Sequence, residues 1–279
     1  MKAILENFTH KKFFILVAAL AFTSNSFAQK TGKGITFTPM LHAFKLDKGN
    51  KAVSTLNIIN NINRDYALEV QIIDWERNEQ GSVRFLPGNT STTSCANWVT
   101  VDKNLIELKA NSQATVNITM NVPDTASTDE MKWCMLLVTT LTEKTAPKKY
   151  GQIQSQLTQR FGAQVIVSNS PPSVTHKEVN MLGFETIEKD SATKALVKCK
   201  NGGKLMLRCT ARIELLSNTT GEKTNIESEE FTMFPEEERH IYMNIPATLP
   251  KGTYTAVAFV DANDDDVPLE ASQATIEIK

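Results

Sequence analysis

The sequence predicts an all-β protein in which two β-sandwiches follow one another behind an N-terminal export signal. Short runs of β-branched and aromatic residues alternate with polar residues and are separated by turn signals, as in sandwich folds. No apolar stripe with a helical period interrupts these runs over a useful length. Two consecutive prolines, Pro171 and Pro172, divide the strand-rich part of the chain into two halves.

The first 28 residues have the composition of a cleaved signal peptide. Lysines precede an apolar run at residues 13–22 (FFILVAALAF), which is shorter than the roughly 20 apolar residues of a membrane-spanning helix. Ser26 and Ala28 place small residues where signal peptidase requires them, so cleavage is predicted after Ala28. We therefore expect a periplasmic mature chain without stable membrane insertion.

The charge balance argues against nucleic acid as a partner. The whole chain has a formal net charge of -1, and removal of residues 1–28 takes away three lysines and one glutamate, which brings the charge to about -3. A near-neutral chain offers no electrostatic attraction for a polyphosphate backbone or for anionic lipid.

The N-terminal half contains a series of strands that together make one immunoglobulin-like sandwich. The segment 66–75 shows the pattern most clearly, because Leu68, Val70 and Ile72 alternate with polar residues, as in a strand with one buried face. A first strand is expected within residues 34–46. Further strands are predicted at residues 52–60, 66–75, 82–86, 98–101, 114–122, 132–140 and 152–167.

The second half repeats this organisation after a stiff linker at residues 169–173 (NSPPS), because prolines withhold backbone donors from any sheet. The expected domains are therefore residues 29–170 and residues 171–279. Strands are predicted at residues 177–187, 195–199, 205–216, 229–233, 240–245, 254–261 and 271–278.

Four cysteines lie in the mature part: Cys95, Cys134, Cys199 and Cys209. Export places them in a compartment where disulfides persist, and an even number permits complete pairing in any of three connectivities. Two fall in each half, which favours Cys95 with Cys134 and Cys199 with Cys209. The alternative, a thiolate metal site, lacks the close Cys-x-x-Cys spacing that zinc sites use.

Several short motifs of the first half resemble the PapD-like periplasmic pilus-assembly chaperones. They are residues 56–61 (LNIINN), 70–75 (VQIIDW), 94–99 (SCANWV), 111–113 (NSQ) and 122–123 (VP). In the second half the resemblance is looser and lies at residues 201–203 (NGG) and 249–254 (LPKGTY).

The resemblance implies a chaperone that lends a strand to a fibre subunit lacking its last strand, a form of β-augmentation. The lent strand would be residues 152–161, with Ile153, Leu157 and Phe161 on one face, after a loop at residues 142–149. The alternative is an ordinary last strand of the first sandwich, since alternation is typical of any half-buried strand.

The resemblance also implies two basic residues that bind the terminal carboxylate of the subunit, because a buried carboxylate requires charged hydrogen-bond donors. Arg160 lies where the second of them is expected; alternatively it is a solvated surface charge. The first strand departs from the family pattern, because it has no arginine and offers only His42 and Lys45. That departure leaves usher dependence open.

No constellation of catalytic or metal-binding residues appears, and no cofactor is expected. The histidines of the mature chain are isolated, and nucleophile elbows, phosphate loops and metalloprotease motifs are missing from the sequence. The acidic run Asp261, Asp264, Asp265 and Asp266 begins like a calcium loop but lacks its glycine and its final glutamate. A hairpin loop is the favoured interpretation of this run.

Two functions fit these features better than an enzyme does. The first is a periplasmic chaperone or assembly factor that binds an exported fibre or envelope subunit by β-strand addition. The alternative is a structural or adhesive envelope protein that uses its immunoglobulin-like domains as spacers.

Overall fold

The chain forms strands where apolar and polar side chains alternate. The computed structural model describes residues 34–127, 129–141, 162–190 and 192–278, and within them the only helical element is a 3-10 turn, η1 (Ala96–Trp98). In β4 (Tyr66–Arg77) Leu68 and Val70 are buried whereas Gln71 is exposed. The all-β prediction is confirmed. None of these residues belongs to a helix with the length and hydropathy of a membrane span.

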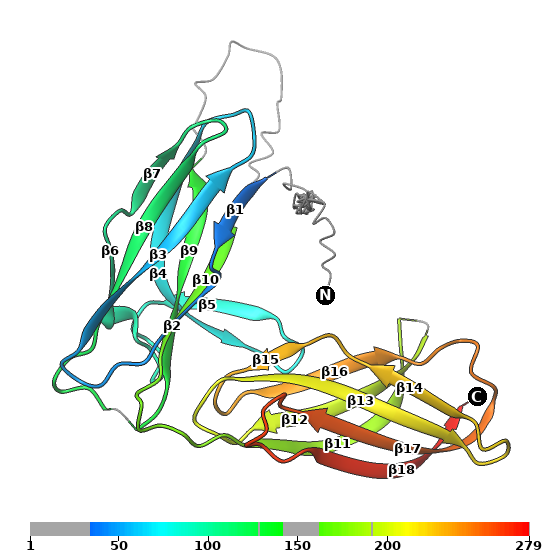
Figure 1. Ribbon diagram of the computed structural model, residues 1–279. Helices are drawn as coiled ribbons and strands as arrows, with labels where there is room; N and C mark the ends of the chain where they lie inside the picture. Colours follow the sequence, from blue (N-terminus) through cyan, green and yellow to red (C-terminus); the bar gives the residue numbers. More distant parts are fainter. Residues whose placement is uncertain (1–33, 128, 142–161, 191, 279) are drawn as a thin grey trace, which may run out of the picture. The chain divides into compact units, whose positions relative to one another are not determined.

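The first sandwich consists of two sheets, drawn in blue to green in Figure 1. One has the strand order β1-β3-β8-β6, and the other has the order β2-β10-β9-β4-β5 with β7 paired to β4. The strands not yet placed are β1 (Ile35–Thr38), β2 (Leu41–Phe44), β3 (Lys51–Asn60), β5 (Val83–Pro87), β6 (Val99–Val101), β7 (Leu105–Leu108), β8 (Gln113–Asn121), β9 (Lys132–Leu141) and β10 (Gly162–Asn169).

The second sandwich also has two sheets, drawn in yellow-green to red in Figure 1. Their orders are β11-β12-β16 and β14-β13-β17-β18, with β15 paired to β13. The strands are β11 (Val179–Lys189), β12 (Ala192–Asn201), β13 (Leu207–Ser217), β14 (Lys223–Glu227), β15 (Phe231–Met233), β16 (Glu238–Asn244), β17 (Gly252–Asp261) and β18 (Glu270–Ile278).

Within the described residues, no strand ladder joins the first pair of sheets to the second. Pro171 and Pro172 lie between the end of β10 and the start of β11. These ladders support a boundary at residue 170, and we retain residues 29–170 and 171–279 as the proposed domains.

Three features of the strand plan differ from the sequence prediction. The expected first strand is divided at the cis bond between Thr38 and Pro39 into β1 and β2, which join different sheets. β7 and β14 were not predicted. Each has only four or five residues, and in β14 Ile226 is the one apolar side chain, so neither carries a full alternating pattern.

Each sandwich has its own apolar core between its sheets. In the first, Leu56, Ile58, Val116 and Ile118 are completely buried. In the second, Ile213 and other side chains of β13 and β17 form the centre of the core. A third and smaller cluster contains side chains from both halves of the chain: Trp75, Met131, Met135 and Phe234.

A buried asparagine closes the corner after β3. The side chain of Asn60 donates to the carbonyl oxygens of Arg64 and Lys109, at 2.8 Å each, and accepts from the backbone N–H of Ile62 at 2.9 Å. Asn60 is 1% exposed. Its amide therefore satisfies backbone groups that would otherwise be buried without partners.

Asn201 forms the same arrangement after β12 in the second sandwich. Its side chain donates to the carbonyl oxygens of Leu205 at 2.8 Å and Met233 at 3.0 Å, and it accepts from the N–H of Gly203 at 2.9 Å. The two asparagines thus make equivalent hydrogen bonds at equivalent corners of the two sandwiches.

Candidate strand-pairing site

The candidate site is one edge of β10 in the first sandwich. β10 pairs with β9 along its whole length, from Gly162 to Asn169, whereas β2 covers the opposite edge only from Ile166 to Asn169. Within the described residues, no strand pairs with that edge from Gly162 to Val165. β10 is therefore paired on two sides in its second half and on one side in its first half.

The hydrogen bonds to β2 show which backbone groups point toward this edge. The N–H of Ile166 donates to the carbonyl of Met40 at 2.9 Å, and that of Ser170 donates to the carbonyl of Phe44 at 3.0 Å. Because backbone groups alternate in direction along a strand, the N–H and C=O of Gln164 point the same way. These groups lie before the point where β2 begins to pair with β10, and Gln164 is exposed. This is the geometry that an added strand requires.

Other sheet edges carry features that hinder strand addition. β5 ends in Pro87, which cannot donate to a ladder. β11 has a bulge between Met181 and Gly183, a common means of protecting an edge. The edge of β16 is already occupied at His240, because the N–H of that residue donates to the carbonyl of Glu79 at 2.7 Å. His240 thus lies on β16, within the strand that the sequence predicts at residues 240–245.

β2 is held beside β10 by two buried side chains and one polar contact. His42 and Phe44 are 2% and 7% exposed and point into the sandwich. The side chain of Asn169 accepts from the N–H of Leu46 at 2.9 Å and donates to its carbonyl at 3.0 Å. These contacts hold the four-residue strand along its length and just beyond its C-terminal end.

His42 has a buried nitrogen without a partner. Its Nδ1 lies 2.7 Å from Oγ of Ser54 on β3, whereas its Nε2 is buried with no hydrogen-bond partner. Burial lowers the pKa of His42, and a backbone interaction with Pro39 opposes this only in part. His42 is therefore a neutral core residue between the sheets and not a basic anchor, and Lys45 is exposed.

The four predicted partner-binding residues, Ile153, Leu157, Arg160 and Phe161, lie outside the residues that the structure describes. Their roles stay predictions. The described part of β10 begins directly after them, at Gly162.

A polar contact accompanies the third apolar cluster. Nε of Arg77 on β4 lies 3.3 Å from a carboxylate oxygen of Glu237, and Nη1 donates to the carbonyl of Thr232 at 3.0 Å. Nη1 of Arg239 donates to the same carbonyl at 3.0 Å. Burial lowers the pKa of Arg77 and raises that of Glu237. The sequence analysis did not anticipate this contact between β4 and the second half.

All four cysteines are free in the structure. Sγ of Cys95 is 3.5 Å from Sγ of Cys134, and both residues are completely buried. Burial raises the pKa of Cys199 and of Cys209 to about 12, so neither is a thiolate at neutral pH. The disulfides stay predictions.

Mass spectrometry of the protein digested without reductant is expected to show both pairs, Cys95 with Cys134 and Cys199 with Cys209. Reduction should lower the free energy of unfolding by about 3 to 4 kcal/mol for the longer loop and by less for the shorter one. The double variant Cys95→Ala, Cys134→Ala is the control. On reduction it should lose only the smaller stabilisation that the disulfide between Cys199 and Cys209 contributes. Free thiols in protein isolated without reductant would contradict the pairing.

The acidic loop after β17 is organised by a lysine and by its own backbone. Nζ of Lys177 lies 2.5 Å from Oδ2 of Asp264 and 3.7 Å from Oδ2 of Asp266. Oδ1 of Asp261 accepts from the N–H of Asn263 at 2.7 Å. The carboxylates are therefore partly neutralised within the chain, as in a hairpin loop.

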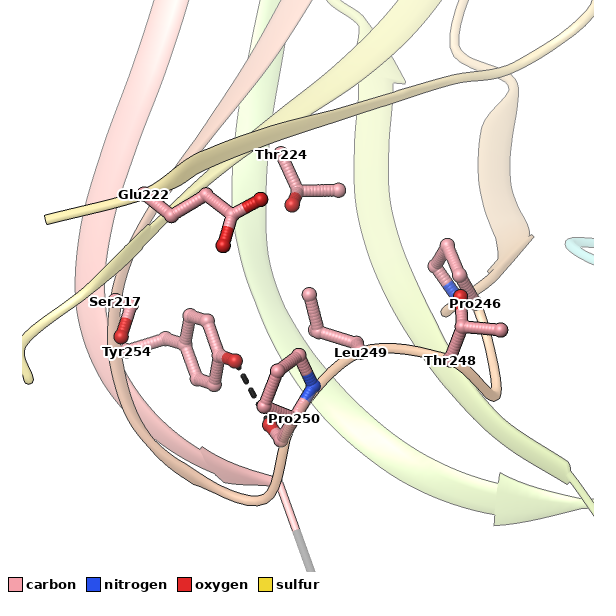
Figure 2. A pocket seen from close by; sticks show the side chains of 8 residues that line it. All are labelled: Ser217, Glu222, Thr224, Pro246, Thr248, Leu249, Pro250 and Tyr254. Carbon is pink, nitrogen blue, oxygen red and sulfur yellow. Dashed lines mark hydrogen bonds between the residues drawn. The ribbon is translucent and has the colours of Figure 1, made fainter. Parts of the chain in front are cut away.

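A small cavity of about 170 Å³ lies at one end of the second sandwich (Figure 2). The hydroxyl of Tyr254 donates to the carbonyl of Pro250 at 2.7 Å across its floor. Glu222 is the one ionisable carboxylate among the lining residues, which are Ser217, Glu222, Thr224, Pro246, Thr248, Leu249, Pro250 and Tyr254. This lining lacks a paired acid and base or a nucleophile with its base.

The fold and the site define an all-β protein of two successive sandwiches, in which the described strands cover one edge of β10 over half its length. No protein-family model matches the sequence, and no curated protein matches it. Similar solved structures include the YadV chaperone, with 10% identity, 87% of this chain and 99% of that chain covered, and a TM-score of 0.46. The periplasmic chaperone SfaE has 13% identity, covers 87% and 98%, and has a TM-score of 0.41.

A third similar structure is the CsuC-CsuE complex of a chaperone and a tip adhesion subunit from the archaic chaperone-usher Csu pili of Acinetobacter baumannii. Its identity is 8%, the coverage is 87% of this chain and 97% of that chain, and the TM-score is 0.45.

Proposed function

We propose that the chain is a periplasmic chaperone or assembly factor that binds an exported fibre or envelope subunit by β-strand addition at β10. The observation that carries this proposal is the edge of β10 at Gly162–Val165, in line with the short strand β2, with which no strand of the described residues pairs. The predicted signal peptide at residues 1–28 and the resemblance of motifs such as residues 94–99 to pilus-assembly chaperones support it.

The physical basis is the hydrogen-bonding capacity of the exposed edge. An added strand gains main-chain hydrogen bonds from the N–H and C=O of Gln164, and its alternate side chains meet the sandwich interior beside Ala163 and Val165. Main-chain pairing supplies affinity that depends little on the sequence of the partner, so a binding protein fits this site better than an enzyme does.

The experiment compares two substitutions at one position. Gln164→Pro removes an N–H that points to the open edge and leaves the ladder to β9 its donors, whereas Gln164→Thr keeps the N–H and changes only the side chain. Each tagged protein is purified from periplasm, and the proteins that accompany it are identified by mass spectrometry. An exported subunit is expected with wild type and Gln164→Thr and is expected to fall at least about tenfold with Gln164→Pro.

Equal recovery of the subunit with Gln164→Pro would contradict strand addition at this edge. If no exported subunit accompanies the wild type, and the protein fractionates with the outer membrane, the spacer function is the better explanation. Thermal unfolding of Gln164→Pro alone shows whether the first sandwich still folds.

A further inference from the structure

His42 combines three properties that no other described histidine has. It lies on β2, the short strand that covers half of the β10 edge, and its ring is buried between the two sheets. Its Nε2 has no hydrogen-bond partner. By contrast, His176 and His240 each lie within about hydrogen-bonding distance of a glutamate, at 3.2 Å from Glu178 and 2.9 Å from Glu238.

We propose that β2 is an acid-sensitive cover of the β10 edge, which is released when the buried ring of His42 takes up a proton. A charged imidazolium has two donors. At this position Nδ1 lies beside the hydroxyl of Ser54 and Nε2 has no hydrogen-bond partner, and the backbone interaction with Pro39 offsets the effect of burial only in part. The charged ring is more stable in water than in the apolar core. It reaches water when β2 leaves the sandwich.

Among the residues that the structure describes, none supplies a compensating charge to His42. Lys45 after β2 and Lys51 at the start of β3 are both exposed and both positive, and the described residues of β10 include no ionisable side chain. Besides burial, the influence on the pKa of His42 is a backbone interaction with Pro39. Cys95, whose Sγ lies 3.8 Å from the carbonyl of Val167 on β10, is held neutral because burial raises its pKa.

The direction of the pH effect follows from the lowered pKa of His42. Released β2 presents a histidine that titrates near its usual pKa of about 6.5, whereas the packed ring titrates at a lower pH. The packing of β2 is therefore fully stable above about pH 6.5. It weakens as the pH falls from that value toward the lower pKa of the packed ring. The population with β2 released rises by up to about tenfold per pH unit within this window.

β2 is small enough to detach without the rest of the sandwich. It has four residues, and its ladder joins it to one neighbour, β10. Edge elements of this kind open locally at a small part of the global unfolding free energy. On release, the open edge would extend from Gly162–Val165 to the whole of β10. That consequence for a client rests on the proposed function, whereas the release itself does not.

Hydrogen exchange measured by mass spectrometry between pH 7.5 and pH 5 tests the release, with rates corrected for the intrinsic pH dependence of exchange. The protection of the Ile166 and Ser170 amides, which donate to β2, is expected to fall by up to about tenfold per pH unit below about pH 6.5. His42→Gln should remove this slope, and the matched control His176→Gln should retain it. The ladder between β4 and β9 should stay protected throughout.

Constant protection of Ile166 and Ser170 in the wild type would overturn the proposal, and so would an equal loss of protection in the β4–β9 ladder, which indicates global unfolding. If His42→Gln does not fold, proton NMR titration of the wild type decides, because the pKa of His42 must lie below its usual value of about 6.5 and the Ile166 amide must lose protection as the ring titrates. These readouts require no client, so they are independent of the capture experiment with Gln164→Pro.

Discussion

Phe234→Ala is expected to lower the free energy of unfolding by about 3 to 5 kcal/mol. Phe234 is 2% exposed, and its ring centroid lies 5.0 Å from that of Trp75 and 4.9 Å from that of Trp133. Truncation removes the aromatic ring that connects residues of β4 and β9 with the second half, and it leaves a cavity among rigid neighbours. Urea unfolding followed by tryptophan fluorescence measures the change.

Phe259→Ala is the matched control on the same sandwich. Phe259 is only partly buried and lies beneath Arg212, whose guanidinium carbon is 4.4 Å from the ring centroid. Its truncation should cost less than about 2 kcal/mol, because part of the ring already contacts water. Equal losses for the two variants would show that the cluster around Phe234 has no special part in stability.

Asn60→Ala and Asn201→Ala are expected to lower the free energy of unfolding by about 3 kcal/mol each. Either substitution removes three hydrogen bonds and leaves two carbonyl oxygens and one N–H without their partner. Unsatisfied buried groups cost about 1 to 3 kcal/mol each, partly relieved by entering water. Thermal or urea unfolding of the two variants, side by side, measures the loss.

Asn57→Ala supplies the control for these asparagines. Asn57 is exposed on β3 and makes one weak contact, in which Nδ2 lies 3.4 Å from the carbonyl of Thr38. Its removal should change stability by no more than about 0.5 kcal/mol. If Asn60→Ala lowered the free energy of unfolding as little as Asn57→Ala does, the prediction would be wrong. Water would then have replaced the hydrogen bonds of the lost amide.

The strands with strong alternation were predictable from the sequence, and the short edge strands were not. β4 and β8 each alternate over most of their length, so their period of two identifies them. β7 and β14 are short and depend on a neighbouring strand, which no local pattern reveals. The division of β1 from β2 also depends on which sheet each half joins.

The candidate site was only partly predictable. The sequence pointed to the segment that ends in β10, but the open edge at Gln164 results from where β2 begins, and that register is non-local. One feature of the sequence does indicate that β4 contacts the second half of the chain near Arg77 and Glu237. Ile73 and Trp75 are apolar at positions of β4 that alternate with its core residues, which indicates a second covering surface.

The ladder between β2 and β10 also has a consequence for the order in which the chain folds. Leu41 pairs with Ile166, so nearly all of the first half must be synthesised before β2 can take its place. Pairings between such distant segments close late, because the entropy of ordering the intervening chain must first be overcome. Until then, the edge of β10 that β2 later covers stays open to pairing with other strands, while β9 can already occupy the opposite edge.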